Sequence, residues 1–82
     1  MELKEEILEK LIARTAVVFK KDPGELSSAT NFVADLKAKS VNMVQIITVL
    51  EDEYDVQITF MEARRKKTIG EMAEYIAQLC GA

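Results

Sequence analysis

The side chain best placed for chemistry in this sequence is that of Ser40. It ends a loop that includes residues 35–39 and directly precedes an apolar-periodic stretch that runs to Tyr54. A serine at such a boundary is either a plain helix N-cap, whose hydroxyl accepts a backbone hydrogen bond, or an exposed point of covalent attachment. The two roles are compatible, and the choice between them decides the function.

Composition argues against an enzyme. The chain has no histidine, which removes the commonest general base and metal ligand and excludes Ser-His and Cys-His nucleophile pairs. Its carboxylates fall on faces that the periodicity marks as solvated. Zinc and calcium-loop spacings are missing, as are Gly-rich phosphate loops. We therefore expect no catalytic residue and no metal site.

The length predicts one domain over residues 1–82, too small for a deep enzymatic cleft beside a core. One proline and three glycines indicate a chain that is folded throughout. No apolar run approaches the roughly 20 residues that cross a bilayer, and the N-terminal residues lack the pattern of a signal peptide. We expect a cytoplasmic protein that does not enter a membrane. The lone cysteine, Cys80, fits a reducing compartment.

The N-terminal stretch predicts an amphipathic helix of about 17 residues. It ends near Lys20 and Lys21, and the turn formers Asp22, Pro23 and Gly24 then break the chain. Residues 22–39 form a loop long enough to indicate a function or a hidden turn of helix. Its expected anchors to the core are Leu26, Phe32, Val33 and Leu36.

A second helix is expected from Ser40, the N-cap, to Tyr54. Met43 and Ile46 are expected at the edge of the buried side of this helix, and no charge occurs between Ser40 and Leu50. Acidic residues gather instead at its C-terminal end, where the helix dipole disfavours them, so a partner surface is one explanation. The buried side is predicted to carry Val41, Val44, Ile47, Leu50 and Tyr54.

Two further helices follow from capping boxes, at Thr59 with Glu62 and at Thr68 with Glu71. The first predicts a short helix over residues 59–66, and the second predicts a last helix over residues 69–79 with an apolar stripe. Residues 56–58 form only a short extended link. The fold class is therefore all-α: a small four-helix bundle with a long loop between helices 1 and 2 and a short third helix.

With this layout, the segment around Ser40 resembles the modification site of acyl carrier proteins and related peptidyl carriers. The resemblance extends along nearly the whole chain, and Ser40 followed by an aliphatic residue is its specific part. Matching positions are Phe32, Asp35, Leu36, Ser40, Val41, Val44, Leu50, Glu51, Tyr54, Ile58, Thr68, Ile69, Tyr75 and Ile76.

The resemblance implies that Ser40 carries a covalent 4'-phosphopantetheine. A phosphopantetheinyl transferase would let the Ser40 hydroxyl attack the pyrophosphate of coenzyme A, leaving an arm whose thiol holds acyl groups as thioesters. The implied partners are that transferase and the acyl-loading and acyl-processing enzymes of a fatty acid, lipid or polyketide-type pathway. The carrier itself would catalyse nothing, and we expect it to be a monomer.

Several positions depart from the pattern of the family. Typical members have Gly where Lys37 stands, Asp where Lys39 stands, and acidic residues at Asn42 and Gln45. Electrostatic steering of partners at this end should therefore be weakened or reversed. Lys66 replaces an apolar residue that usually lines a cavity between the second and third helices, which favours short or polar acyl cargo, or cargo that stays outside the bundle.

These departures predict a specialised carrier with dedicated partners. For the apolar residues Phe60 and Met61, burial in the core is as good an explanation as partner recognition. The predicted partner-recognition residues are Lys39, Val41, Met43, Glu51, Asp52, Phe60 and Met61.

Two alternatives stay open. An unmodified carrier-like helical bundle that serves as a protein-interaction module is favoured by Lys39 beside Ser40, because a transferase that expects an acid there would bind poorly. Nucleic-acid binding rests only on the four cations at residues 64–67, and the net charge of −3 argues for a solvated helix end instead.

Overall fold

In a computed structural model, which describes residues 2–81, the chain forms four α-helices and one short 3₁₀ turn. These elements are α1 (Leu3–Phe19), η1 (Pro23–Glu25), α2 (Ser40–Tyr54), α3 (Phe60–Ala63) and α4 (Ile69–Leu79). The predicted all-α class, with its long first loop and short third helix, is confirmed. The domain predicted over residues 1–82 includes Met1 and Ala82, which lie outside the described residues.

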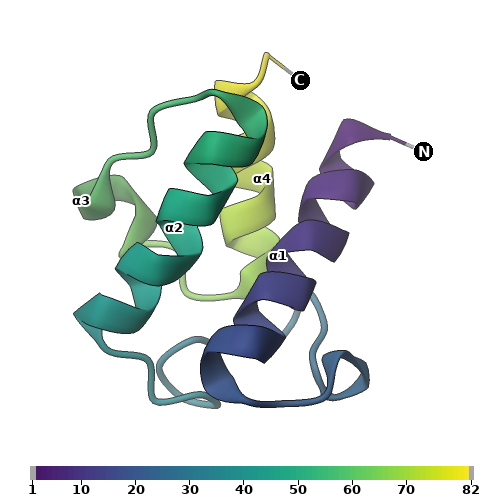
Figure 1. Ribbon diagram of the computed structural model, residues 1–82, viewed down its shortest axis with the longest axis vertical. Coiled ribbons are helices and arrows are strands. Elements are labelled where there is room, and N and C mark those ends of the chain that lie inside the picture. The colour runs from purple at the N-terminus through teal and green to yellow at the C-terminus, as the bar shows by residue number, and fades with distance from the viewer. Residues whose placement is uncertain (1, 82) are drawn as a thin grey trace.

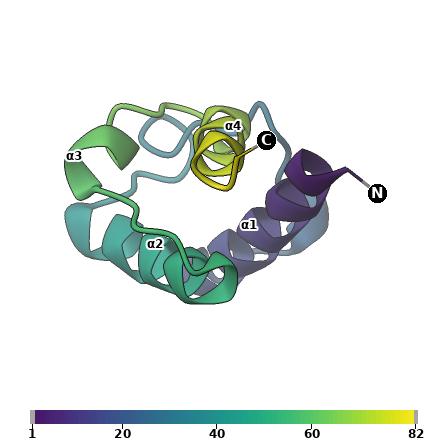
Figure 2. The same ribbon diagram turned by 90° about the horizontal axis from the view of Figure 1, so that it is seen from above.

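The helices α1, α2 and α4 form the body of the molecule (Figure 1). α1 leads away from the end at which both termini lie, and α2 and α4 lead back toward it. α1 packs against both α2 and α4, whereas the short α3 packs against α2. Seen from above, α3 lies beside the first turns of α2, on the side away from α1 (Figure 2).

The predicted first helix is confirmed in length and position. Its buried residues recur every four positions, at Ile7, Leu11 and Thr15, so a single face of α1 meets the other helices. The helix ends at Lys20, whose left-handed backbone (φ 56°) lets its N–H and that of Lys21 reach carbonyls of the last turn. The break at Asp22 forms the 3₁₀ turn η1, which is the hidden turn expected in the long loop.

Hydrogen bonds shape the second half of the long loop. The Asn31 side chain accepts bonds from the backbone N–H groups of Val33 and Ala34, and the Asp35 carboxylate accepts one from Asn31 N–H. This turn points Phe32 and Leu36, four residues apart, into the core. The prediction that Val33 is an anchor is wrong, because the same turn leaves it 70% exposed. Leu26 is buried as expected.

The loop is also held against the start of α4. Phe32 N–H donates to Lys67 O (2.9 Å), Ile69 N–H to Thr30 O (3.0 Å) and Gly70 N–H to Ser28 O (2.9 Å). A Cβ at position 70 would lie 2.9 Å from Ser28 O, so only glycine permits this approach without a shift of the backbone. The long loop is thus a fixed part of the fold.

The predicted buried face of α2 is rotated from the one observed. Met43, Ile46, Ile47 and Leu50 are buried, whereas Val41 and Val44 are 59% and 48% exposed. Two predictions are therefore wrong: that Met43 and Ile46 lie at the edge of the buried face, and that Val41 and Val44 are buried. Because the first three turns of α2 have apolar residues on nearly every side, hydrophobic periodicity alone does not fix the rotation of the helix.

Three predicted caps also need correction. Lys39 rather than Ser40 is the N-cap of α2, and Ser40 is its first helical residue. Thr59 precedes α3 without a side-chain capping bond, and α3 is a single turn rather than a helix to residue 66. At α4, Thr68 Oγ1 accepts from Glu71 N–H as predicted, but the Glu71 carboxylate accepts from Lys67 N–H instead of returning to Thr68. The predicted bounds of α4 are confirmed.

None of the helices described between residues 2 and 81 has both the length and the apolar character needed to span a membrane.

Candidate attachment site and the cavity beside it

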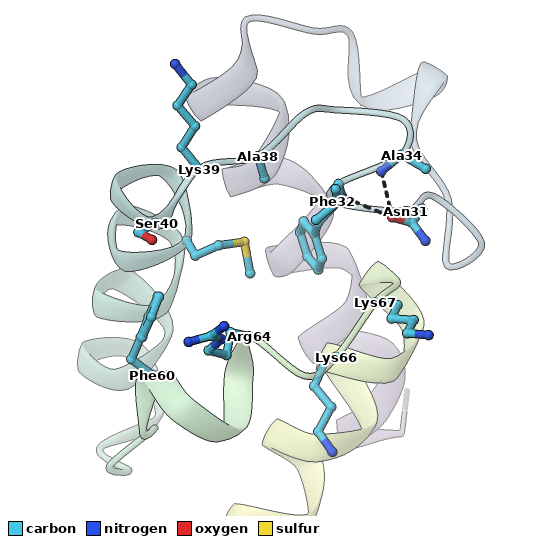
Figure 3. Close-up of a pocket in the computed structure, with 12 residues that line it drawn as sticks. Asn31, Phe32, Ala34, Ala38, Lys39, Ser40, Phe60, Arg64, Lys66 and Lys67 are labelled. Carbon is cyan, nitrogen blue, oxygen red and sulfur yellow. Dashed lines mark hydrogen bonds between the residues drawn. The ribbon is translucent and has the colours of Figure 1, made fainter.

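Ser40 stands exposed at the first helical position of α2 (Figure 3). At this helix start, the Asn42 side-chain oxygen accepts from the N–H of the N-cap residue Lys39 at 2.9 Å. Because Ser40 is the first helical residue and Lys39 is the N-cap, the Ser40 hydroxyl does not serve as the cap. The N–H groups of a first helical turn lack intrahelical acceptors and carry positive partial charge, so this position tolerates a negative group on the serine oxygen.

A cavity of about 590 Å³ opens next to Ser40. It lies between the start of α2, the helix α3 and the loop that precedes Ser40. Phe32 and Met43 are 2% and 7% exposed, so they form the deep part of its wall. The full lining is Asn31, Phe32, Val33, Ala34, Ala38, Lys39, Ser40, Met43, Phe60, Arg64, Lys66 and Lys67.

The charged residues of this lining are all cations: Lys39, Arg64, Lys66 and Lys67. Lys66 was expected to restrict the cavity. Its stem contributes to the wall, but its ammonium lies 5.1 Å from the centre of the Tyr75 ring and turns away from the cavity (Figure 3). The cavity therefore persists despite this lysine.

Four of the predicted site residues meet at this cavity: Lys39, Ser40, Met43 and Phe60. Met43 belongs to the core and reaches the cavity only from inside. Phe60 is half-buried, so core packing and a surface role both apply to it. Met61 and Val41 lie outside the cavity and are exposed at about the same level, 60% and 59%.

The other two predicted residues, Glu51 and Asp52, lie at the far end of α2. The Glu51 carboxylate accepts a hydrogen bond from Ile58 N–H at 2.7 Å and so fastens the α2–α3 connection. Nearby, the carboxylate of Glu53 pairs with Lys10 of α1. Asp52 is exposed to solvent. Glu51 and Glu53 of this acidic cluster thus make structural contacts that the sequence pattern did not reveal.

Sequence reasoning did not assign Phe32 and Arg64 to the site. Phe32 was expected to anchor the loop, which it does, but its ring also lines the cavity. Arg64 was part of the run at residues 64–67. Its spacing of four from Phe60 was the available signal, because residues four apart share one face of a helix.

The stretch of residues 9–76 matches a protein-family model described as "Phosphopantetheine attachment site". The chain belongs to this family of phosphopantetheine carriers. The match covers α2, α3 and the loop before Ser40 in full and most of α1 and α4, which agrees with the expected resemblance. The chain is a divergent member, as the identities to its relatives show.

Two curated relatives are named acyl carrier proteins. That of Lactobacillus acidophilus is 39% identical over 72 residues, which are 88% of this chain and 90% of the relative. That of Thermosynechococcus vestitus is 37% identical over 71 residues, covering 87% and 88%. A solved structure of acyl carrier protein from Enterococcus faecalis superposes with a TM-score of 0.78 at 26% identity, covering 95% of this chain and 99% of that one.

Membership makes this chain an acyl carrier protein with a covalent 4'-phosphopantetheine, not an enzyme. The exposed hydroxyl at a helix start, with cations around it, fits a phosphodiester-linked group. When bound, that group supplies a thiol on a flexible arm, which carries acyl groups as thioesters. A phosphopantetheinyl transferase and acyl-processing enzymes are the partners that membership implies.

Proposed function

We propose that Ser40 is the attachment residue and that the chain carries acyl intermediates of a specialised fatty acid, lipid or polyketide-type pathway in the cytoplasm, as a monomer of one domain. The observation that carries the proposal is the exposed Ser40 at the start of α2, where Lys39 and not Ser40 is the N-cap. The other two serines, Ser27 and Ser28, lie in the loop, and neither begins a helix.

In this role the protein positions its serine and catalyses nothing. The bonds that fix the loop to α4 hold residues 31–38 in place, so the chain enters α2 in one geometry. The first turn of α2 offers N–H groups to the developing phosphodiester, and Lys39 adds positive charge beside it. The transferase supplies the catalytic groups.

Dedicated partners are the second part of the proposal. In most carriers acid residues near the serine face basic partner surfaces, but here Lys37 and Lys39 bring positive charge and α2 is uncharged from Ser40 to Leu50. The exposed Val41, next to Ser40 on α2, and the exposed Met61 of α3 add apolar surface. A partner built for acidic carriers should therefore bind this protein poorly, because like charges meet at the interface.

The test of attachment is intact mass spectrometry after incubation with coenzyme A, magnesium and a broadly tolerant phosphopantetheinyl transferase. We expect the parent protein to gain one phosphopantetheine and Ser40→Ala to gain none. Ser28→Ala is the matched control, because Ser28 is exposed, lies in the loop and has no side-chain hydrogen bond that α2 needs; it should be modified like the parent.

A gain on Ser40→Ala would refute Ser40 as the attachment residue. No gain on any of the proteins, with circular dichroism showing intact helices and a native-source transferase also inactive, would instead support the unmodified interaction module. A standard fatty acid ketosynthase that accepts the loaded protein as readily as a typical acidic carrier would refute the proposal of dedicated partners.

A further inference from the structure

The cavity beside Ser40 combines apolar walls with one cation that faces inward. Phe32, Met43 and Phe60 supply the larger apolar surfaces. Of the four cationic lining residues, Arg64 has its guanidinium among the lining side chains, on the side toward Phe60 (Figure 3). The ammonium ends of the three lysines point outward in the same view. An occupant of this cavity would thus meet apolar rings and a guanidinium together.

Among residues 2–81, no carboxylate forms an ion pair with Arg64. Within the same residues, the lining of the cavity brings no acidic residue to it. The neighbouring Arg65 differs, since its guanidinium lies 3.7 Å from the Glu62 carboxylate on the outer face of α3. Guanidinium groups bind carboxylates through two parallel hydrogen bonds. A carboxylate is therefore the group that best completes the surroundings of Arg64.

We propose that the cavity holds an acyl cargo whose far end is a carboxylate, with Arg64 as the specificity-determining residue. The cargo would be a dicarboxylic acyl group: one carboxyl forms the thioester and the other, across an apolar spacer, pairs with Arg64. The spacer covers the half-buried ring of Phe60, which a bare anion would leave exposed to water. This inference rests on attachment at Ser40, because only an arm on that serine delivers its end to this cavity.

The expected preference is modest. Arg64 is exposed to solvent, and exposed ion pairs gain little, so a carboxylate should be favoured over a methyl group of equal length by roughly two- to fivefold. Cargo too short to cover the apolar walls should lose this preference.

The test attaches the arm chemically, so that it does not depend on any transferase. In the full chain with Ser40→Cys and Cys80→Ala, the cysteine thiolate displaces iodide from an iodoacetamide pantetheine analogue. The arm ends in a six-carbon acyl group with a ¹³C-labelled terminal carboxylate, or in its methyl counterpart. In NMR titrations, we expect the pKa of the labelled carboxyl to fall by roughly 0.3 to 0.7 unit relative to the same protein in urea.

Arg64→Gln should return that pKa to the value in urea, whereas Arg65→Gln should leave it lowered. As a second measurement, the amide signals of Phe32 and Met43 should differ between the carboxylate and methyl arms. An equal pKa in the parent and Arg64→Gln proteins, or amide signals that do not distinguish the arms, would overturn the inference. Failure of attachment at Ser40 itself is read separately, from the mass of the transferase-treated protein.

Discussion

The two ends of α2 carry opposite charge, and they use it differently. At the C-terminal end, Glu51 accepts from Ile58 N–H, Glu53 pairs with Lys10, and the Tyr54 hydroxyl donates to Glu6 at 3.4 Å. At the Ser40 end, the ion pairs among residues 2–81 include neither Lys39 nor Arg64. Charged groups at the far end hold the bundle together, whereas Lys39 and Arg64 near Ser40 are available to a group outside the chain.

This difference changes how the acidic cluster is understood. Clustered acids at a helix C-terminus are unfavourable to the helix dipole, which suggested a partner surface. The contacts of Glu51 and Glu53 give a simpler reason, since each bond joins α2 to another segment of the fold. Asp52, which is exposed, is the residue of this cluster with the best claim to a recognition role.

The comparison is tested most strongly by Glu51→Ala. Removing the carboxylate leaves Ile58 N–H without its acceptor in a partly buried position, so we expect the free energy of unfolding to fall by about 1–3 kcal/mol. Asp52→Ala is the matched control and should change it by less than about 0.5 kcal/mol. Urea denaturation followed by circular dichroism measures both. Equal effects would show that the far end is not held by this bond.

Tyr54 gives the far end a pH signature. Partial burial, together with the negative charge and hydrogen bond of Glu6, raises the pKa of Tyr54 to about 12. The unfolded chain loses this proton at about pH 10, so the contribution of Tyr54 to stability is complete below pH 10 and is lost as the pH rises toward 12. In Tyr75→Phe, the phenolate absorbance reports Tyr54 alone and should titrate near pH 12 when folded. Titration near pH 10 in the folded protein would contradict the burial of this ring.

Lys37, near the Ser40 end, holds an unfavourable backbone conformation. Its φ of +52° lies in the left-handed region, which costs a non-glycine residue roughly 1–2 kcal/mol. Lys37→Gly removes this strain but adds freedom to the unfolded chain, so a net stabilisation of about 0.5–1 kcal/mol is expected. Lys37→Ala, which removes the same charge without relieving φ, separates backbone from charge. If both variants stabilise equally in thermal denaturation, strain is not the cause.

The smallest expected effect concerns the cations around Ser40. Because they lack carboxylate partners within residues 2–81, Lys39→Gln and Arg64→Gln should each change the free energy of unfolding by less than about 0.5 kcal/mol. Lys10→Gln, which breaks the pair with Glu53, is the far-end counterpart and should be the most destabilising of the three. A larger loss from Arg64→Gln than from Lys10→Gln, measured by urea denaturation, would break the contrast between the two ends.

The sequence by itself determined the fold class, the positions of the longer helices, and the placement of Ser40 at the start of α2. Apolar spacing and the break at Asp22 are local signals, so α1 and α4 were predictable nearly to the residue. The loop before Ser40 and the aliphatic residue after it resemble the modification site of carrier domains, so the attachment residue was predicted without knowledge of any contact.

Only the tertiary structure decided which face of α2 is buried and what surrounds Ser40. The rotation of α2 depends on packing against α1 and α3, because apolar residues occupy both its buried and its exposed sides. The turn held by Asn31 turned Phe32 inward and Val33 outward, and packing brought Arg64 to the cavity, 24 positions along the chain from Ser40. Spacing along a chain fixes which residues share one helical face, whereas which faces meet depends on contacts between segments far apart in sequence.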